Sequence, residues 1–179
     1  MALKSTIFKA ELQVADMDRA YYGDHALTIA RHPSEQDARM MVRVLAFALH
    51  ANPALAFAQG LTASDEPDLW QRDATGTIEC WIDVGQPDER LVRRACGRAA
   101  QVVIYAFGRP ADAWWARSAP AMARLGNLAV WRIAPHVIDA LAALAQRTMR
   151  LQCTVQDGQV WFGNRDTVVE LTLERLRPA

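Results

Sequence analysis

The chain has 179 residues, of which 51% are hydrophobic and 22% charged, and this is the size and composition of one globular domain. Twenty Lys and Arg balance 20 Asp and Glu, so no net charge draws the whole molecule to nucleic acid or anionic lipid. No segment approaches the ~18 apolar residues of a membrane span, and the first ten residues lack the apolar core of a signal peptide. We therefore expect a cytoplasmic protein that makes no membrane contact.

The three cysteines are Cys80, Cys96 and Cys153, and they are too widely spaced to suggest a zinc site. Their odd number also disfavours a disulfide framework. The sequence therefore predicts reduced thiols that are mostly buried.

The first half of the chain mixes strand and helix patterns. Apolar and polar residues alternate over 6–14, which predicts a strand, and 21–29 is its expected hairpin partner. Helical spacing predicts a helix over about 35–50, with Ser34 and Asp37 forming a capping box at its start. Further strands are predicted from Asp68 and over 77–84, followed by a helix capped by Asp88 and a buried strand over 102–107.

The second half continues the alternation of helices and strands. A helix is expected over 112–125, a strand over 128–133 and a helix over 135–146. Strands at 150–156 and 159–163 flank Asp157-Gly158, which is a strong hairpin signal, and a last strand follows at 167–173. The order predicts a single α/β domain with a mixed central sheet flanked by helices.

The strand at 77–84 carries the most informative polar pattern. Glu79, Trp81 and Asp83 lie on one face of it and apolar residues on the other. Asp68 precedes Glu79 by ten intervening residues, so two adjacent antiparallel strands would bring their carboxylates together. Such a pair suffices for weak binding of Mg²⁺ or Mn²⁺, which prefer oxygen ligands. The alternative is that Asp68 caps a turn and Glu79 lies on a solvated face.

The order of these elements resembles that of the PD-(D/E)XK nuclease superfamily. The matching features are Glu35 at the start of a helix, Pro67-Asp68, then Glu79-Cys80-Trp81, and the helix and strand that follow. The resemblance covers about residues 34–107. It implies a restriction-endonuclease-like core, to which an N-terminal hairpin and C-terminal strands are added.

Several longer stretches resemble the YaeQ family, a bacterial family. They cover nearly the whole chain and are Ala2–Asp18, Ala30-Arg-His-Pro-Ser-Glu35, Asp65-Glu-Pro-Asp-Leu-Trp70, Gly85-Gln-Pro-Asp-Glu89 and Ala95-Cys-Gly-Arg98. This resemblance implies one YaeQ-like domain over 1–179, with a variant of the nuclease-like fold.

The resemblance assigns roles to individual residues. Asp68 and Glu79 match the two metal-binding carboxylates, and Glu35 matches the glutamate that some members add on the helix. Trp81 occupies the position of the superfamily's lysine, yet an indole cannot activate water or stabilise a phosphate. The residues that could replace the lysine are Lys9, Gln86 and Asp83. For Lys9, the alternative is a solvated strand residue.

The best basic cluster lies on the helix that begins near Asp88. Arg90, Arg93 and Arg94 are the candidates for nucleic-acid contacts there, and a solvated helix face is the alternative. Two functions follow from the sequence. The first is a Mg²⁺-dependent phosphodiesterase of the nuclease type that acts on nucleic acid. The second is a catalytically inactive protein of the same fold that binds nucleic acid or a protein partner.

Overall fold

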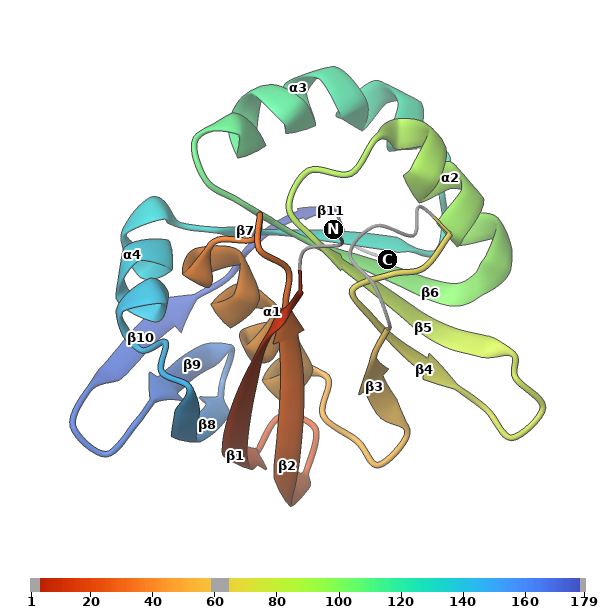
Figure 1. Ribbon diagram of the computed structural model, residues 1–179. Helices are drawn as coiled ribbons and strands as arrows, with labels where there is room; N and C mark the ends of the chain where they lie inside the picture. Colours follow the sequence, from red (N-terminus) through yellow and green to blue (C-terminus); the bar gives the residue numbers. More distant parts are fainter. Residues whose placement is uncertain (1–3, 59–64, 178–179) are drawn as a thin grey trace. The chain divides into compact units, whose positions relative to one another are not determined.

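The computed structural model describes residues 4–58 and 65–177, and the chain forms two compact units (Figure 1). The first unit comprises 1–53 and 136–172, and the second comprises 54–135 and 173–179. Each unit contains its own mixed β-sheet and helices, which confirms the predicted α/β class. Two sheets take the place of the single central sheet that we expected, and the proposed core at 34–107 is divided between the units.

The first unit is built on a five-stranded sheet with the order β10-β9-β8-β1-β2. Strands β1 and β8 are parallel, and the other pairs are antiparallel. Its strands are β1 (Thr6–Asp16), β2 (Tyr21–Arg31), β8 (Thr148–Gln156), β9 (Gln159–Gly163) and β10 (Val168–Thr172). Its helices are α1 (Asp37–Leu49) and α4 (Pro135–Ala143), although Pro135 itself belongs to the second unit.

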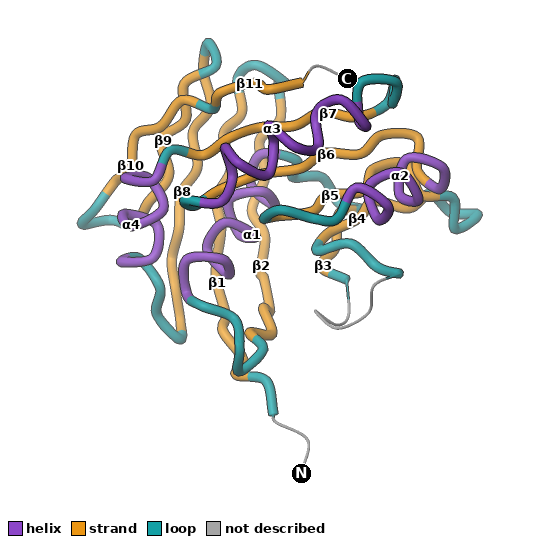
Figure 2. Tube along the Cα trace, turned by 90° about the horizontal axis from the view of Figure 1, so that it is seen from above, coloured by secondary structure: helices purple, strands orange, loops and turns teal. Residues whose placement is uncertain are grey.

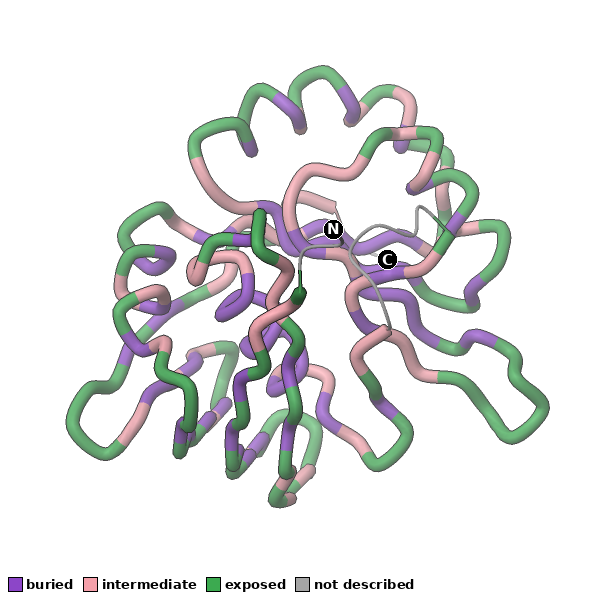
Figure 3. The backbone as a smooth tube through the Cα atoms, in the orientation of Figure 1, coloured by how far each residue is buried: buried purple, intermediate pink, exposed green. Residues whose placement is uncertain are grey.

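The two faces of this first sheet differ sharply in burial. On β1, Phe8, Leu12 and Val14 are buried, whereas the alternate residues are exposed (Figure 3). Helix α1 contacts the buried face, where the Phe47 ring meets the His25 ring edge-on with 5.1 Å between centroids. The period of two in the sequence thus gives one apolar face and one open polar face.

A two-residue turn joins β8 to β9. Asp157 and Gly158 have φ values of 52° and 75°, the left-handed conformations that a tight hairpin of this kind requires. The Asp18 carboxylate accepts hydrogen bonds from both of their backbone N–H groups, at 2.7 and 2.9 Å. The hairpin predicted from the Asp-Gly pair is therefore confirmed.

The second unit is built on a six-stranded sheet with the order β11-β7-β6-β5-β4-β3. Strands β5, β6 and β7 are parallel, and the outer pairs are antiparallel. Its strands are β3 (Leu55–Phe57), β4 (Leu69–Arg72), β5 (Ile78–Val84), β6 (Ala99–Phe107), β7 (Leu128–Ile133) and β11 (Glu174–Arg177). Its helices are α2 (Glu89–Arg98) and α3 (Pro110–Met122).

Helices α2 and α3 cover the same face of the second sheet (Figures 1 and 2). Their buried side chains, among them Val92 and Trp114, pack on Val102 and Ile104 of β6. From Val102 onward the other face of β6 is also buried, which explains the uninterrupted apolar run over 102–107.

The two predicted helix caps have different outcomes. Asp88 caps α2 as expected, because its side chain accepts a hydrogen bond from the Arg90 N–H at 2.8 Å. The capping box at Ser34 is wrong, because α1 begins with Gln36 at the N-cap and no side-chain cap bond. The Ser34 hydroxyl instead bonds to the His32 ring at 2.6 Å, and Asp37 pairs with Arg31.

All three cysteines are free thiols, as predicted. Cys80 and Cys153 are buried and Cys96 is half-buried. Burial raises the pKa of Cys80 to about 11 and that of Cys153 to about 12, so these thiols stay protonated near neutral pH. Within the described ranges, no helix is long and apolar enough to cross a membrane.

A buried carboxylate joins the β1–β2 turn to the end of α1. Asp16 is 2% exposed and accepts two hydrogen bonds from Arg19, one from its backbone N–H and one from its Nε. Arg19 also donates from Nη1 to the Ala51 carbonyl at 3.1 Å. Burial, and then the Arg19 cation, lower the pKa of nearby His50 to about 4, with Asp16 offsetting part of the shift.

This lowered pKa predicts a pH-dependent stability. In the unfolded chain His50 has a pKa near 6.5, whereas in the folded chain it stays neutral down to about pH 4. Between these two pH values the unfolded chain binds a proton that the folded chain does not bind, so the folded state is fully stable above pH 6.5 and loses stability as the pH falls toward 4. We expect the free energy of unfolding to fall by about 1 to 2 kcal/mol between pH 7 and pH 5. Urea unfolding at several pH values measures it. In His50→Gln most of this slope should vanish, and an unchanged slope would contradict the assignment.

Candidate functional site

The β4–β5 hairpin determines which carboxylate faces Asp68. Trp70 lies opposite Trp81, and Leu69 lies opposite Ile82. Asp68 comes immediately before Leu69, and its N–H donates to the Ile82 carbonyl at 3.1 Å and to Asp83 Oδ1 at 3.3 Å. The structure therefore pairs Asp68 with Asp83 at the open end of the hairpin.

Glu79 lies on β5, the strand that carries Asp83, but farther from Asp68. It precedes Asp83 by four residues, which corresponds to about 13 Å along an extended chain. Its exposed carboxylate accepts a hydrogen bond from the Gln71 side chain. The strands that carry Asp68 and Glu79 are adjacent, as predicted, but their register leaves Glu79 outside the pair.

A β-bulge decides whether Ile82 or Asp83 lies beside Asp68, whereas Glu79 lies at the bulge itself, near the turn. The ladder shifts between Gln71 and Arg72, so that Gln71 faces Cys80 whereas Arg72 faces Ile78. A shift of one residue exchanges the faces of a strand, and here it places Asp83 rather than Ile82 opposite Asp68. The turn at 73–76 can be recognised in the sequence, but nothing in the local pattern marks the bulge.

Hydrogen bonds from neutral donors orient both carboxylates. Asp83 Oδ2 accepts from Trp81 Nε1 at 2.8 Å, and Asp68 Oδ2 accepts from the Val84 N–H at 2.8 Å. Both aspartates are half-buried. Each carboxylate oxygen can accept more than one partner, so these bonds are compatible with a cation between the two side chains.

Trp81 is part of the hydrophobic core. It is 4% exposed and belongs to the apolar cluster that α2 covers through Val92 and Ala95. The Arg98 guanidinium lies over its ring, 5.2 Å from the centroid. At the position where the nuclease resemblance would call for a lysine, the chain therefore has a buried indole, and its Nε1–H holds Asp83 in place.

Gln86 joins the ends of two parallel strands. It follows Gly85, whose φ of 103° turns the chain away from β5 and whose N–H donates to the Tyr105 carbonyl at 2.9 Å. The Gln86 side chain donates to the carbonyl of Phe107, the last residue of β6. Gln86 therefore lies just beyond the end of the strand that carries Asp83.

The arginines proposed for nucleic-acid contacts lie on α2. Arg90, Arg93 and Arg94 are exposed. Arg94 forms an ion pair with Asp65 at 2.8 Å, and Arg98 donates to the Asp65 carbonyl at 2.7 Å. The segment before β4 thus neutralises part of the basic face.

Glu35 and Lys9 belong to the first unit, where the Glu35 side chain forms a buried ion pair. Both of its oxygens accept from the buried Arg43, at 2.8 and 2.7 Å, and Oε1 also accepts from Arg39 at 3.1 Å. Lys9 is exposed on β1, opposite Thr28, which matches the alternative of a solvated strand residue.

The Glu35–Arg43 pair yields a stability prediction. Glu35→Gln would leave the Arg43 cation buried without its anion, which costs about 3 to 5 kcal/mol of unfolding free energy. Chemical denaturation measures the loss. The double variant Glu35→Gln with Arg43→Met should recover much of it, because it removes the uncompensated charge. A single variant as stable as the wild type would show that the ion pair carries no stability.

Within the described part of the chain, no group of three or more His, Cys, Asp or Glu side chains could hold a metal ion. The donor set at the candidate site is therefore the two carboxylates of Asp68 and Asp83. Mg²⁺ commonly takes one or two carboxylates and completes its shell with water and substrate phosphate, so this set fits that ion.

Two mixed sheets, one of them with a carboxylate pair at its strand ends, define an α/β protein with a candidate cation site. The chain belongs to the YaeQ family, since the family model described as YaeQ protein matches residues 1–173. It is 44% identical to an uncharacterized YaeQ protein of Salmonella typhi, over 97% of this chain and 96% of that one. It is 42% identical, with the same coverage, to that of Escherichia coli (strain K12).

Solved structures of YaeQ proteins share the fold. The crystal structure from Xanthomonas axonopodis pv. citri has a TM-score of 0.94 and 48% identity, covering 98% of this chain and 99% of that one. The crystal structure from Pseudomonas syringae has a TM-score of 0.93 and 34% identity, covering 98% of this chain and 97% of that one.

Proposed function

We propose that this protein is a divalent-cation-dependent phosphodiesterase of the nuclease type that acts on nucleic acid. The observation that carries the proposal is the approach of Asp68 and Asp83 at the open end of the β4–β5 hairpin. Asp83 replaces Glu79 as the second carboxylate ligand, because the register puts it opposite Asp68. Mg²⁺ or Mn²⁺ would be held between these two side chains.

The cation would polarise a phosphoryl oxygen and lower the pKa of bound water. The chain's own residues position the reacting groups. The Trp81 indole and the Val84 N–H fix the orientation of the two carboxylates, so little reorganisation is needed when substrate binds. The exposed Arg90 and Arg93 supply sequence-independent contacts to phosphates.

A second candidate function is a protein that keeps the fold but binds nucleic acid, or a protein partner, without catalysis. The observation in its favour is the burial of Trp81 at the lysine position. An indole N–H that already donates to Asp83 has no proton-transfer capacity to offer an attacking water. The two functions differ in phosphodiester cleavage, which allows them to be separated.

Cation binding tests the carboxylate pair directly. In calorimetric titrations with Mn²⁺, Asp68→Asn and Asp83→Asn should each lower the affinity roughly tenfold or more, because each removes one of two anionic ligands. The matched control is Glu79→Gln, which lies on the same strand and should bind like the wild type. If Glu79→Gln loses binding and Asp83→Asn retains it, the assignment of Asp83 is wrong.

Cleavage tests the reaction. With Mg²⁺ or Mn²⁺ present, the wild type should hydrolyse bis(p-nitrophenyl) phosphate and single- or double-stranded oligonucleotides, and chelation by EDTA should abolish the activity. We expect Asp83→Asn to lower kcat/KM on the order of 100-fold or more, since the cation supplies the main electrostatic stabilisation. A wild type that binds Mn²⁺ and oligonucleotide but cleaves none of these substrates would favour the second function.

A further inference from the structure

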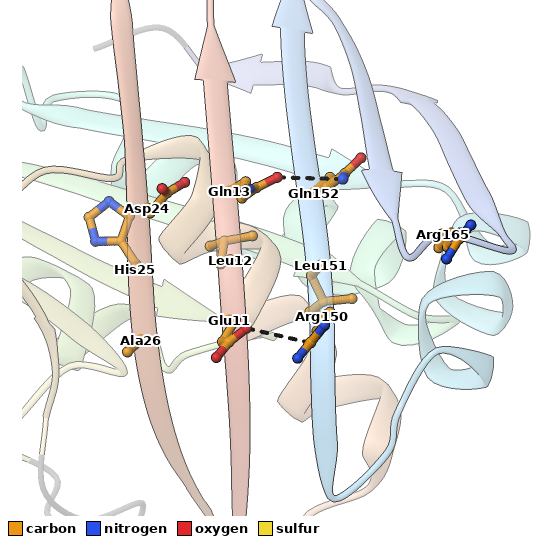
Figure 4. A pocket seen from close by; sticks show the side chains of 10 residues that line it. All are labelled: Glu11, Leu12, Gln13, Asp24, His25, Ala26, Arg150, Leu151, Gln152 and Arg165. Carbon is orange, nitrogen blue, oxygen red and sulfur yellow. Dashed lines mark hydrogen bonds and ion pairs between the residues drawn. The ribbon is translucent and has the colours of Figure 1, made fainter.

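The open face of the first unit's sheet contains a pocket of about 760 Å³ (Figure 4). Its lining side chains come from three adjacent strands, β2, β1 and β8, and from the turn after β9. The polar members of the lining are Glu11, Gln13, Asp24, Arg150, Gln152 and Arg165. A volume of this size is typical of small-molecule sites.

The strand register arranges these groups in two rows. In one row, Asp24 of β2 lies opposite Gln13 of β1, which lies beside Gln152 of β8. The two amides are joined by a hydrogen bond of 3.5 Å from Gln152 Nε2 to Gln13 Oε1. In the other row, Glu11 lies beside Arg150, with 3.5 Å between Oε2 and Nε (Figure 4).

A tightly held turn carries Arg165. The Asn164 side chain accepts hydrogen bonds from the N–H groups of Asp166 and Thr167, at 2.9 and 2.7 Å. A Cβ on Gly163 would lie 2.0 Å from the Thr167 carbonyl oxygen, so only glycine permits this close approach. Arg165 is thereby held at a defined edge of the pocket.

The charges of the pocket balance. Two carboxylates, Glu11 and Asp24, face two guanidinium groups, Arg150 and Arg165, so the pocket does not attract a polyanion. Glu11 and Arg150 already neutralise each other at short range, whereas Asp24 of β2 and Arg165 after β9 lie at opposite sides of the pocket, with β1 and β8 between them. The pocket offers hydrogen-bond acceptors on its carboxylates, donors on its guanidinium groups, and both kinds on its two side-chain amides.

A hydroxyl group is both a donor and an acceptor, so a polyhydroxylated ligand can satisfy carboxylates, guanidinium groups and amides together. We propose that this pocket binds a neutral oligosaccharide. The site belongs to the first unit and is separate from the carboxylate pair of the second unit.

Two aromatic side chains on the same face extend the proposed site. Trp161 of β9 is half-buried and lies diagonal to Gln152, since Gln152 pairs with Gly163 and Thr154 pairs with Trp161. Diagonal neighbours across a sheet are within reach of an aromatic ring. Tyr22 is 66% exposed and lies two residues from Asp24 on β2. These rings offer flat apolar surfaces on which the C–H faces of sugar rings can stack.

The test is a ¹H–¹⁵N NMR titration of the full chain with maltohexaose, cellohexaose and chitohexaose in separate experiments. We expect at least one of them to shift the amide signals of residues 11–13, 24–26 and 150–152, with a Kd of about 1 mM or tighter. A DNA oligonucleotide at the same concentration should leave these signals in place.

Variants on the open face of the sheet test the site, and one of them is the control. The double variant Gln13→Ala with Gln152→Ala, and separately Trp161→Ala, should each weaken binding roughly tenfold. Thr28→Ala lies on the same open face outside the pocket lining and should bind like the wild type, and unchanged signals elsewhere show that each variant is folded. The proposal is overturned if no oligosaccharide shifts these signals, if the shifts fall elsewhere, if the DNA oligonucleotide shifts them, or if the Gln variant binds undiminished.

Discussion

The packing of Trp81 beneath α2 is the constraint on which the second unit's candidate site depends. Burying this indole requires its face of β5 to turn toward the helix, and strand alternation then places Asp83 on that same face. The indole N–H needs a partner once it is buried, and Asp83 supplies it at 2.8 Å. The buried side chain that packs beneath α2 is therefore also the one that holds a carboxylate of the candidate site in place.

The two units use their sheets in different ways. In the second unit, helices cover one face and both faces of the central strand β6 are buried, so polar groups gather where the strands end. In the first unit, one face of the sheet stays open, and polar side chains of β1, β2 and β8 share a pocket there. Strand ends suit a small cation, whereas a broad open face suits an extended ligand.

The chain has no net charge, and several of its arginines are also neutralised individually by ion pairs. Arg94 is paired with Asp65, Arg43 with Glu35, and Arg150 with Glu11. Such pairing limits the field that the basic residues project into solvent. The arginines that remain exposed on α2 form a small patch, so any contact with phosphates is local and adds to a site rather than defining it.

The sequence by itself determined most of the elements, because strand alternation and helical spacing are local properties. It identified the β1–β2 hairpin, the Asp157-Gly158 turn and the Asp88 cap, together with Asp68 and Gln86 as site candidates. Only the tertiary structure decided that Asp83 faces Asp68, because the bulge after Gln71 shifts the register without a local signal. The sequence likewise gives no sign that both Glu35 oxygens accept hydrogen bonds from Arg43, eight residues away. Register and burial depend on contacts between segments, which periodicity within one segment cannot encode.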